Sequence, residues 1–536
     1  MSGLFDEKRT GGATRRDVRT QKEKNSQKKT RTITIAVISV LIVVFVGALI
    51  INSSFIRRSA SAITIDGVSF SVAEFDYFYN WAVFEYTDFI HQNMPDFAGG
   101  MLPNRERPFA SQIQDTNTNA TWADFFVDRA ITNMSGIVQL YNAARASGFE
   151  MSDENIANME AQFNMLIHEG ELGSARQPIL HPTPMSYLQA IYGNALNEAT
   201  LRRVLELTFT AWSYSDHVRE SLAYTQDQLE AFYMDNADAF DIFRYRMLMI
   251  EPEIQDPADF TTGDELADAQ DEAEAVAAQR AEEIIAIITS EEDFIAAALM
   301  ENPIAHADPR STFVQQQGEF LNPQLADWLA DETRQPGDIT SIEVNNAHQI
   351  VFFIERDTNN YHMAEMRQLL FLREDVFPED FADGEDDPEF IAASEAVEAD
   401  VRARGEAALA AFEAGGSLEQ VLIDMIPDFS DDPTEGGFYD NIARAPFQGV
   451  INRAMQVVPE LEDWLFDPAR QAGDFELVRT EAFGYHLMFF AGHGEQFNHF
   501  IARERLQAQD HMDWRENLPE VTEIERHWAF TLTDQR

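Results

Sequence analysis

The chain repeats one stretch of its own sequence. Pro323-Gln-Leu-Ala-Asp-Trp-Leu-Ala-Asp is followed by Arg334-Gln-Pro-Gly-Asp, and the pattern returns as Pro459-Glu-Leu-Glu-Asp-Trp-Leu-Phe-Asp and Arg470-Gln-Ala-Gly-Asp. Ten positions match at a constant offset of 136 residues, and one of them is tryptophan, of which the chain has only 7. A match at a fixed period indicates a structural repeat. We therefore expect two tandem copies of one module, and the question is what the module does.

Charge divides the chain into a basic tail and an acidic body. Residues 1–31 hold 10 Lys or Arg and 4 Asp or Glu, whereas the remaining residues hold 29 and 88. A strongly negative body repels nucleic acid and anionic lipid headgroups, so we expect neither as a partner. It favours solubility and is compatible with cationic polypeptide clients. The alternative interpretation is a general acidic surface shared by proteins of the source organism.

An uncharged apolar segment, residues 32–52, joins the two parts. About 20 residues at ~1.5 Å each span the hydrocarbon core of a bilayer as a helix. The segment therefore predicts a single transmembrane helix. The basic tail, 1–31, places the N-terminus in the cytoplasm and the acidic body outside it, although Arg57 and Arg58 on the far side weaken the charge bias.

A cleaved signal peptide is the alternative to a retained anchor, because Ala60-Ser61-Ala62 resembles a cleavage site. The long leader and the long apolar run favour the anchor. The chain has no cysteine, which excludes disulfides, thiolate metal sites and lipid attachment through cysteine. The histidines show no metal-ligand spacing, so we expect no metal and no cofactor.

Residues 62–240 read as a mainly helical domain. A short strand and turn at 63–70 precede Ser71-Val-Ala-Glu74, which has the form of a capping box and opens an aromatic helix. Helical periodicity follows in five further segments: 122–147, 152–168, 185–193, 197–222 and 226–240. Residues 96–120, rich in Pro, Asn, Thr and Gly, predict a surface loop.

Two α+β modules follow, at 243–357 and 362–493. Each predicts a β-like run, two helices, the repeated short helix and two closing strands, in the order β-α-α-α-β-β. The tail at 497–536 predicts a helix over 498–516 and a strand over 528–533. It has no linker of its own, so we expect it to pack back on the helical domain. The predicted fold class is thus α+β, with a transmembrane helix in front.

The second module carries the motifs Ser430-Asp-Asp-Pro-Thr-Glu-Gly-Gly, Val457-Val-Pro-Glu-Leu461 and Phe483-Gly-Tyr-His486. In this combination and order the module resembles the parvulin family of peptidyl-prolyl isomerases. The family reads approximately Ser-x-(Cys/Asp), Gly-Gly, Met-Val-Pro-x-Phe and Phe-Gly-Tyr-His. The resemblance covers residues 362–493, and it is the combination, not any single motif, that is specific.

The resemblance implies a set of site residues. Asp432 stands where the family has its Cys or Asp, His486 is the C-terminal family histidine, and Gln368 stands where the family has its first histidine. Three residues would line the proline pocket: Val457, Leu461 and Phe483. Gln368 can form hydrogen bonds but cannot take the charge states of imidazole, and Val457 and Leu461 are smaller than the family's Met and Phe. We therefore expect weak activity. The alternative is a packed structural His486 and an Asp432 that only shapes a turn.

The first module is more degenerate. Met247 occupies the place of the first histidine, and the counterpart of His486 is Gln349 or Ile350, depending on a one-residue gap. No Ser-Asp-Asp-Pro and Gly-Gly segment is present there. We expect a copy that has kept the fold and not the site.

The whole chain resembles extracytoplasmic chaperone-isomerases of the SurA and PrsA type, which combine a helical N-terminal region, one or two parvulin modules and a returning C-terminal helix. The resemblance implies a membrane-anchored foldase that acts on unfolded or nascent exported polypeptides with X–Pro bonds. The alternatives are a non-catalytic holdase and a structural envelope protein that use the modules only for binding. The sequence does not indicate an oligomeric state.

Overall fold

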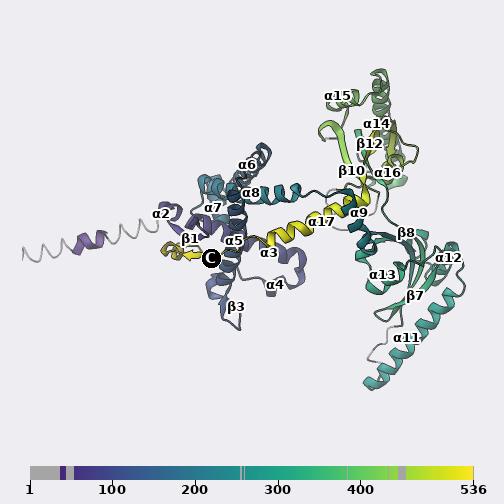
Figure 1. The fold of residues 1–536 in the computed structure, drawn as a ribbon, viewed down its shortest axis with the longest axis horizontal. Helices are drawn as coiled ribbons and strands as arrows, with labels where there is room; N and C mark the ends of the chain where they lie inside the picture. The colour runs from purple at the N-terminus through teal and green to yellow at the C-terminus, as the bar shows by residue number, and fades with distance from the viewer. Residues whose placement is uncertain are drawn as a thin grey trace, which may run out of the picture. The chain divides into compact units, whose positions relative to one another are not determined.

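The computed structural model describes residues 37–43, 54–253, 256, 258, 260–382, 384–432, 434–444 and 454–534. The fold class is α+β, and the described residues divide into two compact units. The first contains residues 54–222 and 510–534, and the second contains 223–509. Figure 1 shows the chain coloured along its length. Most of the expected transmembrane segment, 32–52, lies outside the described residues. Among the described residues no helix has the length and apolar character needed to cross a membrane.

The first unit is built on a three-stranded sheet in the order β13-β1-β2. Strands β1 (Ser61–Ile65) and β2 (Val68–Ser71) form a hairpin whose turn uses positive φ at Asp66 and Gly67. The capping box at Ser71 is confirmed, since Glu74 accepts from the Ser71 N–H at 2.6 Å. It opens α3 (Val72–Asn93). Four longer helices complete the unit: α5 (Trp122–Ser147), α6 (Asp153–Arg176), α7 (Pro184–Tyr192) and α8 (Glu198–Ser221).

Two expectations for this unit are wrong in detail. The segment 96–120 is not a plain loop, because it contains α4 (Ala98–Met101) and the hairpin of β3 (Ile113–Asp115) and β4 (Ala120–Thr121). The expected strand at 528–533 is a 3-10 helix, Trp528–Leu532, and the real strand is β13 (Ile524–Arg526), paired with β1. All three residues of β13 are exposed, so no apolar alternation marks it in the sequence.

The expected helix at 226–240 is two helices, α9 (Gln226–Asp235) and α10 (Ala237–Phe240), and both belong to the second unit. Their buried Leu229 and Phe240 pack with Phe497 and Phe500 of α17 (Phe497–Glu516). Asn359 is fully buried and links α9 to α10, because it donates to the Tyr233 hydroxyl and the Phe240 carbonyl, both at 2.9 Å.

The two modules share one topology. The first contains β5 (Ile242–Ile250), α11 (Gly263–Ile285), α12 (Glu291–Glu301), β6 (Phe313–Gln317), α13 (Pro323–Leu329), β7 (Ile339–Val344) and β8 (Ala347–Asp357). The second contains β9 (His362–Leu372), α14 (Pro388–Ala414), α15 (Glu419–Phe429), β10 (Phe438–Ile442), α16 (Pro459–Leu465), β11 (Phe475–Thr480) and β12 (Gly484–Gln496). The antiparallel sheets run β6-β5-β8-β7 and β10-β9-β12-β11.

Each module therefore has a strand that the predicted order β-α-α-α-β-β omits. The omitted strands, β6 and β10, are edge strands of five residues. Their sequences, Phe-Val-Gln-Gln-Gln and Phe-Tyr-Asp-Asn-Ile, carry polar residues on positions that face partly into the protein. Period-2 hydrophobic alternation is consequently weak, and the ladder with the neighbouring strand forms without that signal.

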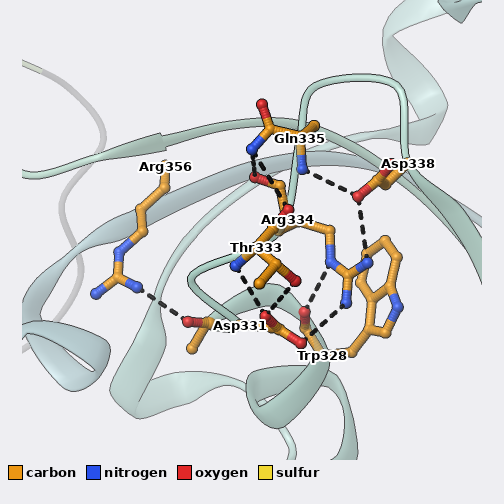
Figure 2. Close-up of polar contacts among 8 residues, drawn as sticks. Trp328, Asp331, Thr333, Arg334, Gln335, Asp338 and Arg356 are labelled. Atoms are coloured by element: carbon orange, nitrogen blue, oxygen red, sulfur yellow. Dashed lines mark hydrogen bonds and ion pairs between the residues drawn. The ribbon is translucent and has the colours of Figure 1, made fainter.

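The repeated motif has a structural explanation (Figure 2). In the first module the Arg334 guanidinium lies 3.9 Å from the Trp328 ring centre and donates to the Trp328 carbonyl at 3.0 Å. Asp338 accepts from the Gln335 N–H at 2.9 Å, and Gly337 takes φ +96°, which side chains disfavour.

The second copy reproduces these contacts. The Arg470 guanidinium lies 3.9 Å from the Trp464 ring centre, and Asp474 accepts from the Gln471 N–H at 2.8 Å. Gly473 takes φ +95°. The ten matched positions thus encode a short helix and the turn that leads into β7 or β11.

Candidate functional site

Asp432 is positioned by a segment that follows α15 and runs along β9. Ser430 accepts from the Leu370 N–H at 3.1 Å, and the Asp431 N–H donates to the Leu370 carbonyl at 2.8 Å. The Asp432 carboxylate accepts from the Thr434 N–H at 2.9 Å. The turn role considered for Asp432 is therefore real. The same contacts also place its other carboxylate oxygen beside the β-sheet.

The structure brings the three expected polar site residues into one buried chain. Gln368 donates from Nε2 to Asp432 Oδ2 at 2.8 Å, and His486 Nδ1 lies 2.8 Å from Gln368 Oε1. Gln368 and His486 come from adjacent strands, β9 and β12. The exposed fractions are 7% for Gln368, 8% for Asp432 and 3% for His486.

Two further residues join this chain. Tyr439 on β10 donates to Asp432 Oδ2 at 2.7 Å, and Thr480 at the end of β11 lies 3.0 Å from His486 Nε2. Neither was found from the sequence. Tyr439 lies on a strand that the sequence did not reveal, and Thr480 carries no motif of its own. The signal that could have found Thr480 is its place opposite Gly484 across the β11–β12 hairpin.

The direction of every hydrogen bond follows from Asp432. An ionised carboxylate only accepts, so the Gln368 amide must turn its nitrogen toward it and its oxygen toward His486. His486 must then carry its proton on Nδ1, and Nε2 accepts from the Thr480 hydroxyl. Thr480 in turn accepts from the Phe483 N–H at 3.3 Å. The hydrogen bonds thus place a proton on His486 Nδ1, and the lowered pKa of His486 leaves Nε2 unprotonated near pH 7.

The electrostatics agree with this arrangement. Burial lowers the pKa of His486 to about 4, and the nearby carboxylates of Asp432 and Glu460 only partly oppose it. Burial alone would raise the pKa of Asp432, but hydrogen bonds from Tyr439, Thr434 and Gln368 outweigh burial and lower it. Burial, together with Asp432, raises the pKa of Tyr439. Near pH 7 the site therefore holds one carboxylate, a neutral imidazole and a neutral phenol.

Four of these hydrogen-bonded residues form the polar side of a cavity of about 480 Å³: Gln368, Asp432, Tyr439 and His486. Its apolar lining is Met366, Leu370, Met455, Val457, Val458, Leu461 and Phe483. All three pocket residues expected from the sequence thus reach the cavity. Leu461 is buried, whereas Phe483 is 44% exposed and packs edge-on against the His486 ring at 6.2 Å. The cavity can hold an apolar ring beside hydrogen-bonding groups.

Among the described residues that line the cavity there is no hydroxyl or amine nucleophile other than the Tyr439 phenol. Thr480 and His486 form a hydroxyl–imidazole pair, but Thr480 is 1% exposed and does not line the cavity. Asp432 already receives three hydrogen bonds, from Gln368, the Thr434 N–H and Tyr439. The arrangement is suited to binding and polarising a ligand without forming a covalent bond to it.

The first module lacks this site, and the strand register identifies each counterpart. Val478 pairs with His486, and the equivalent Ile342 pairs with Gln349, so Gln349 and not Ile350 takes the place of His486. The gap arises because the β11–β12 hairpin loop is one residue longer than the β7–β8 loop. Met247, opposite Val351, takes the place of Gln368, opposite Met488.

Comparisons with known proteins add no assignment. No protein-family model matches the chain, and no curated protein matches it.

Proposed function

We propose that the second module is a peptidyl-prolyl cis-trans isomerase of the parvulin type. The observation that carries the proposal is the cavity in which the Asp432–Gln368–His486 chain faces an apolar wall formed by Val457, Leu461 and Phe483. The motif resemblance of residues 362–493 supports it. The first module acts as a spacer or peptide-binding copy without catalysis.

Rotation about an X–Pro bond must overcome a barrier of ~18–20 kcal/mol that comes from amide resonance. The planar amide places negative charge on its carbonyl oxygen, and the twisted amide does not. An apolar cavity holds the proline ring, and a carboxylate beside the carbonyl oxygen disfavours the charge-separated planar form. Asp432 therefore supplies the electrostatic effect, Gln368 and His486 hold it in place, and no cofactor takes part.

The test uses proline-limited refolding of a client protein with the full chain in detergent. We expect acceleration by the wild type and a loss of at least about tenfold in Asp432→Ala. Asp308→Ala is the matched control, because Asp308 also precedes a proline but lies in the first module, where it is exposed. Refolding at the uncatalysed rate with wild type would remove the proposal.

The chain as a whole is proposed to be a membrane-anchored extracytoplasmic foldase, held through 32–52 with its N-terminus in the cytoplasm. Residues just after this segment support retention, not cleavage. Arg58 donates to the Ala195 carbonyl at 2.7 Å, and Arg57 lies 3.7 Å from the buried Asp76. Ala62 is fully buried and accepts from the His527 N–H at 2.8 Å. The intact mass of the membrane-extracted protein tests this point, and a chain beginning at Ile63 would contradict it.

A non-catalytic holdase is the second candidate. Of the aromatic side chains on α3 and α5, Phe75, Phe78 and Phe126 are buried in the core. Phe84 is 60% exposed, however, and Phe89 is 50% exposed on the same helix. These exposed aromatic side chains are available to contact apolar segments of a client. A holdase predicts suppression of client aggregation that survives loss of both Asp432 and His486, and absence of suppression at any ratio excludes it.

A further inference from the structure

The two copies of the module provide an internal comparison that separates scaffold residues from site residues. On β5, Arg246 pairs with Glu291 and lies 5.6 Å from the Phe313 ring centre. In the second copy Arg367 pairs with Glu419 and lies 4.7 Å from the Phe438 ring centre. This cluster is kept in both copies, as is the arginine–tryptophan turn, so both belong to the scaffold.

The hydrogen-bonded residues of the site, in contrast, are not kept in both copies. By strand register the first module has Met247 for Gln368, Val314 for Tyr439, Val344 for Thr480 and Gln349 for His486. Val314 is assigned because it pairs with Tyr245, as Tyr439 pairs with Met366. Tyr439 is therefore absent from the copy that also lacks Gln368, Thr480 and His486, although the neighbouring phenylalanine of the strand is kept.

Tyr439 has the geometry of a support for Asp432. Its hydroxyl donates to Asp432 Oδ2 at 2.7 Å and lies 2.8 Å from the Thr434 hydroxyl. Because the Tyr439 proton goes to the carboxylate, Thr434 donates to Tyr439. No Arg is within ion-pair distance of Asp432 among the described residues, so neutral donors alone stabilise its charge.

We infer that Tyr439 is a positioning residue of the second module's site, which keeps Asp432 ionised and turned toward Gln368. This inference rests on the proposed isomerase function and assigns to that site a residue outside the motifs from which it was recognised. Without the phenol, Asp432 Oδ2 retains Gln368 as its donor and loses the shorter of its two hydrogen bonds. The carboxylate then protonates more easily. A protonated Asp432 can donate as well as accept, so it no longer fixes the orientation of the Gln368 amide.

The direction of the pH effect follows from these contacts. The hydrogen bond from Tyr439 is among the interactions that lower the pKa of Asp432, so its removal raises that pKa. The other titratable groups that face the chain are His486, which is neutral above about pH 4, and Glu460, which acts on His486. Neither changes charge near pH 6. If the pH at which activity falls moves up toward pH 6, the change is therefore caused by protonation of Asp432.

The experiment compares Tyr439→Phe with Tyr485→Phe in the full chain. Tyr485 lies beside His486 on β12 but faces α14, and its hydroxyl donates to the Glu398 carboxylate at 3.2 Å. Both variants therefore lose one phenol-to-carboxylate hydrogen bond in the same module. We expect Tyr439→Phe to lower isomerase kcat/KM about 3- to 10-fold at pH 6 and to move the acid limb of the pH profile upward. We expect the Tyr485→Phe profile to match the wild type. An unchanged acid limb in Tyr439→Phe overturns the inference.

A second measurement separates this inference from the proposed function. If the wild type does not catalyse isomerisation, the proposed function fails, and the role of Tyr439 is read from thermal unfolding. The wild type should then unfold a few degrees above Tyr439→Phe at pH 7. The difference should shrink at a lower pH, at which Asp432 begins to protonate, because a protonated carboxyl gains less from the phenol. A difference that is the same at both pH values assigns Tyr439 an ordinary packing role and overturns the inference.

Discussion

Gln368 decides how the site responds to pH. It links Asp432 to His486 through one amide whose two ends cannot exchange roles, because the carboxylate accepts only. With Gln368 in place, none of the hydrogen-bonded site residues Asp432, His486 and Tyr439 changes charge between pH 6 and pH 8. We expect the isomerase activity of the wild type to be constant in that range.

The variant Gln368→His introduces the one side chain that ordinarily titrates in that range. Its imidazole would lie beside both Asp432 and His486, so its protonation changes the hydrogen bonds on both sides. We expect a new ionisation between pH 5 and pH 8 in the profile of kcat/KM. Gln368→Met, which reproduces Met247 of the first module, is the control and should be inactive without a new ionisation. A flat profile for Gln368→His would contradict the linking role of the amide.

His486 makes the stability of the second module depend on pH. Its pKa is about 4 in the folded protein and about 6.5 in an unfolded chain, so the unfolded state binds more protons below pH 6.5. Stability is therefore lost as pH falls from 6.5 toward 4, by roughly 3 kcal/mol from this one group. Chemical denaturation of the wild type and His486→Gln at pH 7 and pH 4 checks this. The variant should lose less stability between the two pH values, and an equal loss would show that His486 is not the group responsible.

At this scale the sequence predicted the residues that stand in motifs. Asp432, Gln368 and His486 meet in the structure, and Val457, Leu461 and Phe483 line the same cavity. Tyr439 and Thr480 were missed because their roles depend on strand register, which a motif does not record. The choice between Gln349 and Ile350 needed the length of a hairpin loop for the same reason.

At the scale of elements, the Gly-Gly pair fixes the distance between β9 and the segment that carries Asp432. Gly437 has φ +53°, and a Cβ there would lie 2.5 Å from the Gln368 carbonyl oxygen. Gly436 also has positive φ, +67°, but its Cβ would meet only the tip of the Arg367 side chain at 3.2 Å. Both glycines thus have a backbone conformation that other residues disfavour, but only Gly437 lies against a backbone atom of β9.

We expect Gly437→Ala to destabilise the second module by about 2–4 kcal/mol, because a backbone atom of β9 must move in addition to the unfavourable φ. Gly436→Ala should cost only about 1 kcal/mol. Urea unfolding of both variants gives the comparison, with isomerase activity measured alongside. Equal costs would show that backbone conformation alone, and not the approach to Gln368, requires glycine at 437.

Elements with strong periodicity were predicted well, and elements stabilised only by a neighbouring strand were not. The helix expected at 122–147 is α5, Trp122–Ser147, because its apolar face packs in the core of the first unit. Strands β6, β10 and β13 were missed, since their backbones pair while their side chains are largely polar or exposed. Hydrogen bonding to a partner strand leaves no pattern within the strand itself.

At the scale of the whole molecule, the first unit is discontinuous in sequence. Residues 510–534 belong to it, and β13 pairs with β1 in the register Ile63 to Arg526. Asp66 in the β1–β2 turn accepts from the Thr522 and Glu523 N–H groups at 3.1 and 2.8 Å. The residues of α9 and α10, read from the sequence as part of the helical domain, lie in the other unit, because helical periodicity does not tell which core a helix joins.

This discontinuity predicts that the first unit is completed only when the end of the chain is present. Five apolar side chains from the tail belong to its core or pack on it: Leu518, Val521, Ala529, Phe530 and Leu532. Truncation after Glu516 removes them together with β13, and we expect it to destabilise the first unit by roughly 5 kcal/mol. Amide hydrogen exchange should show loss of protection in β1 and α5, while β9 and β12 of the second unit keep theirs.

Trp528→Ser is the matched control for the truncation, because Trp528 lies in the same tail and is 61% exposed. Its loss removes a large side chain without removing a core contact, so protection of β1 and α5 should stay at the wild-type level. If the truncated chain instead keeps full protection in α5, the tail only covers a core that the preceding residues 54–222 already complete. The free energy of the first unit would then lie in α3, α5 and α8 alone, and the pairing of β13 with β1 would contribute little to it.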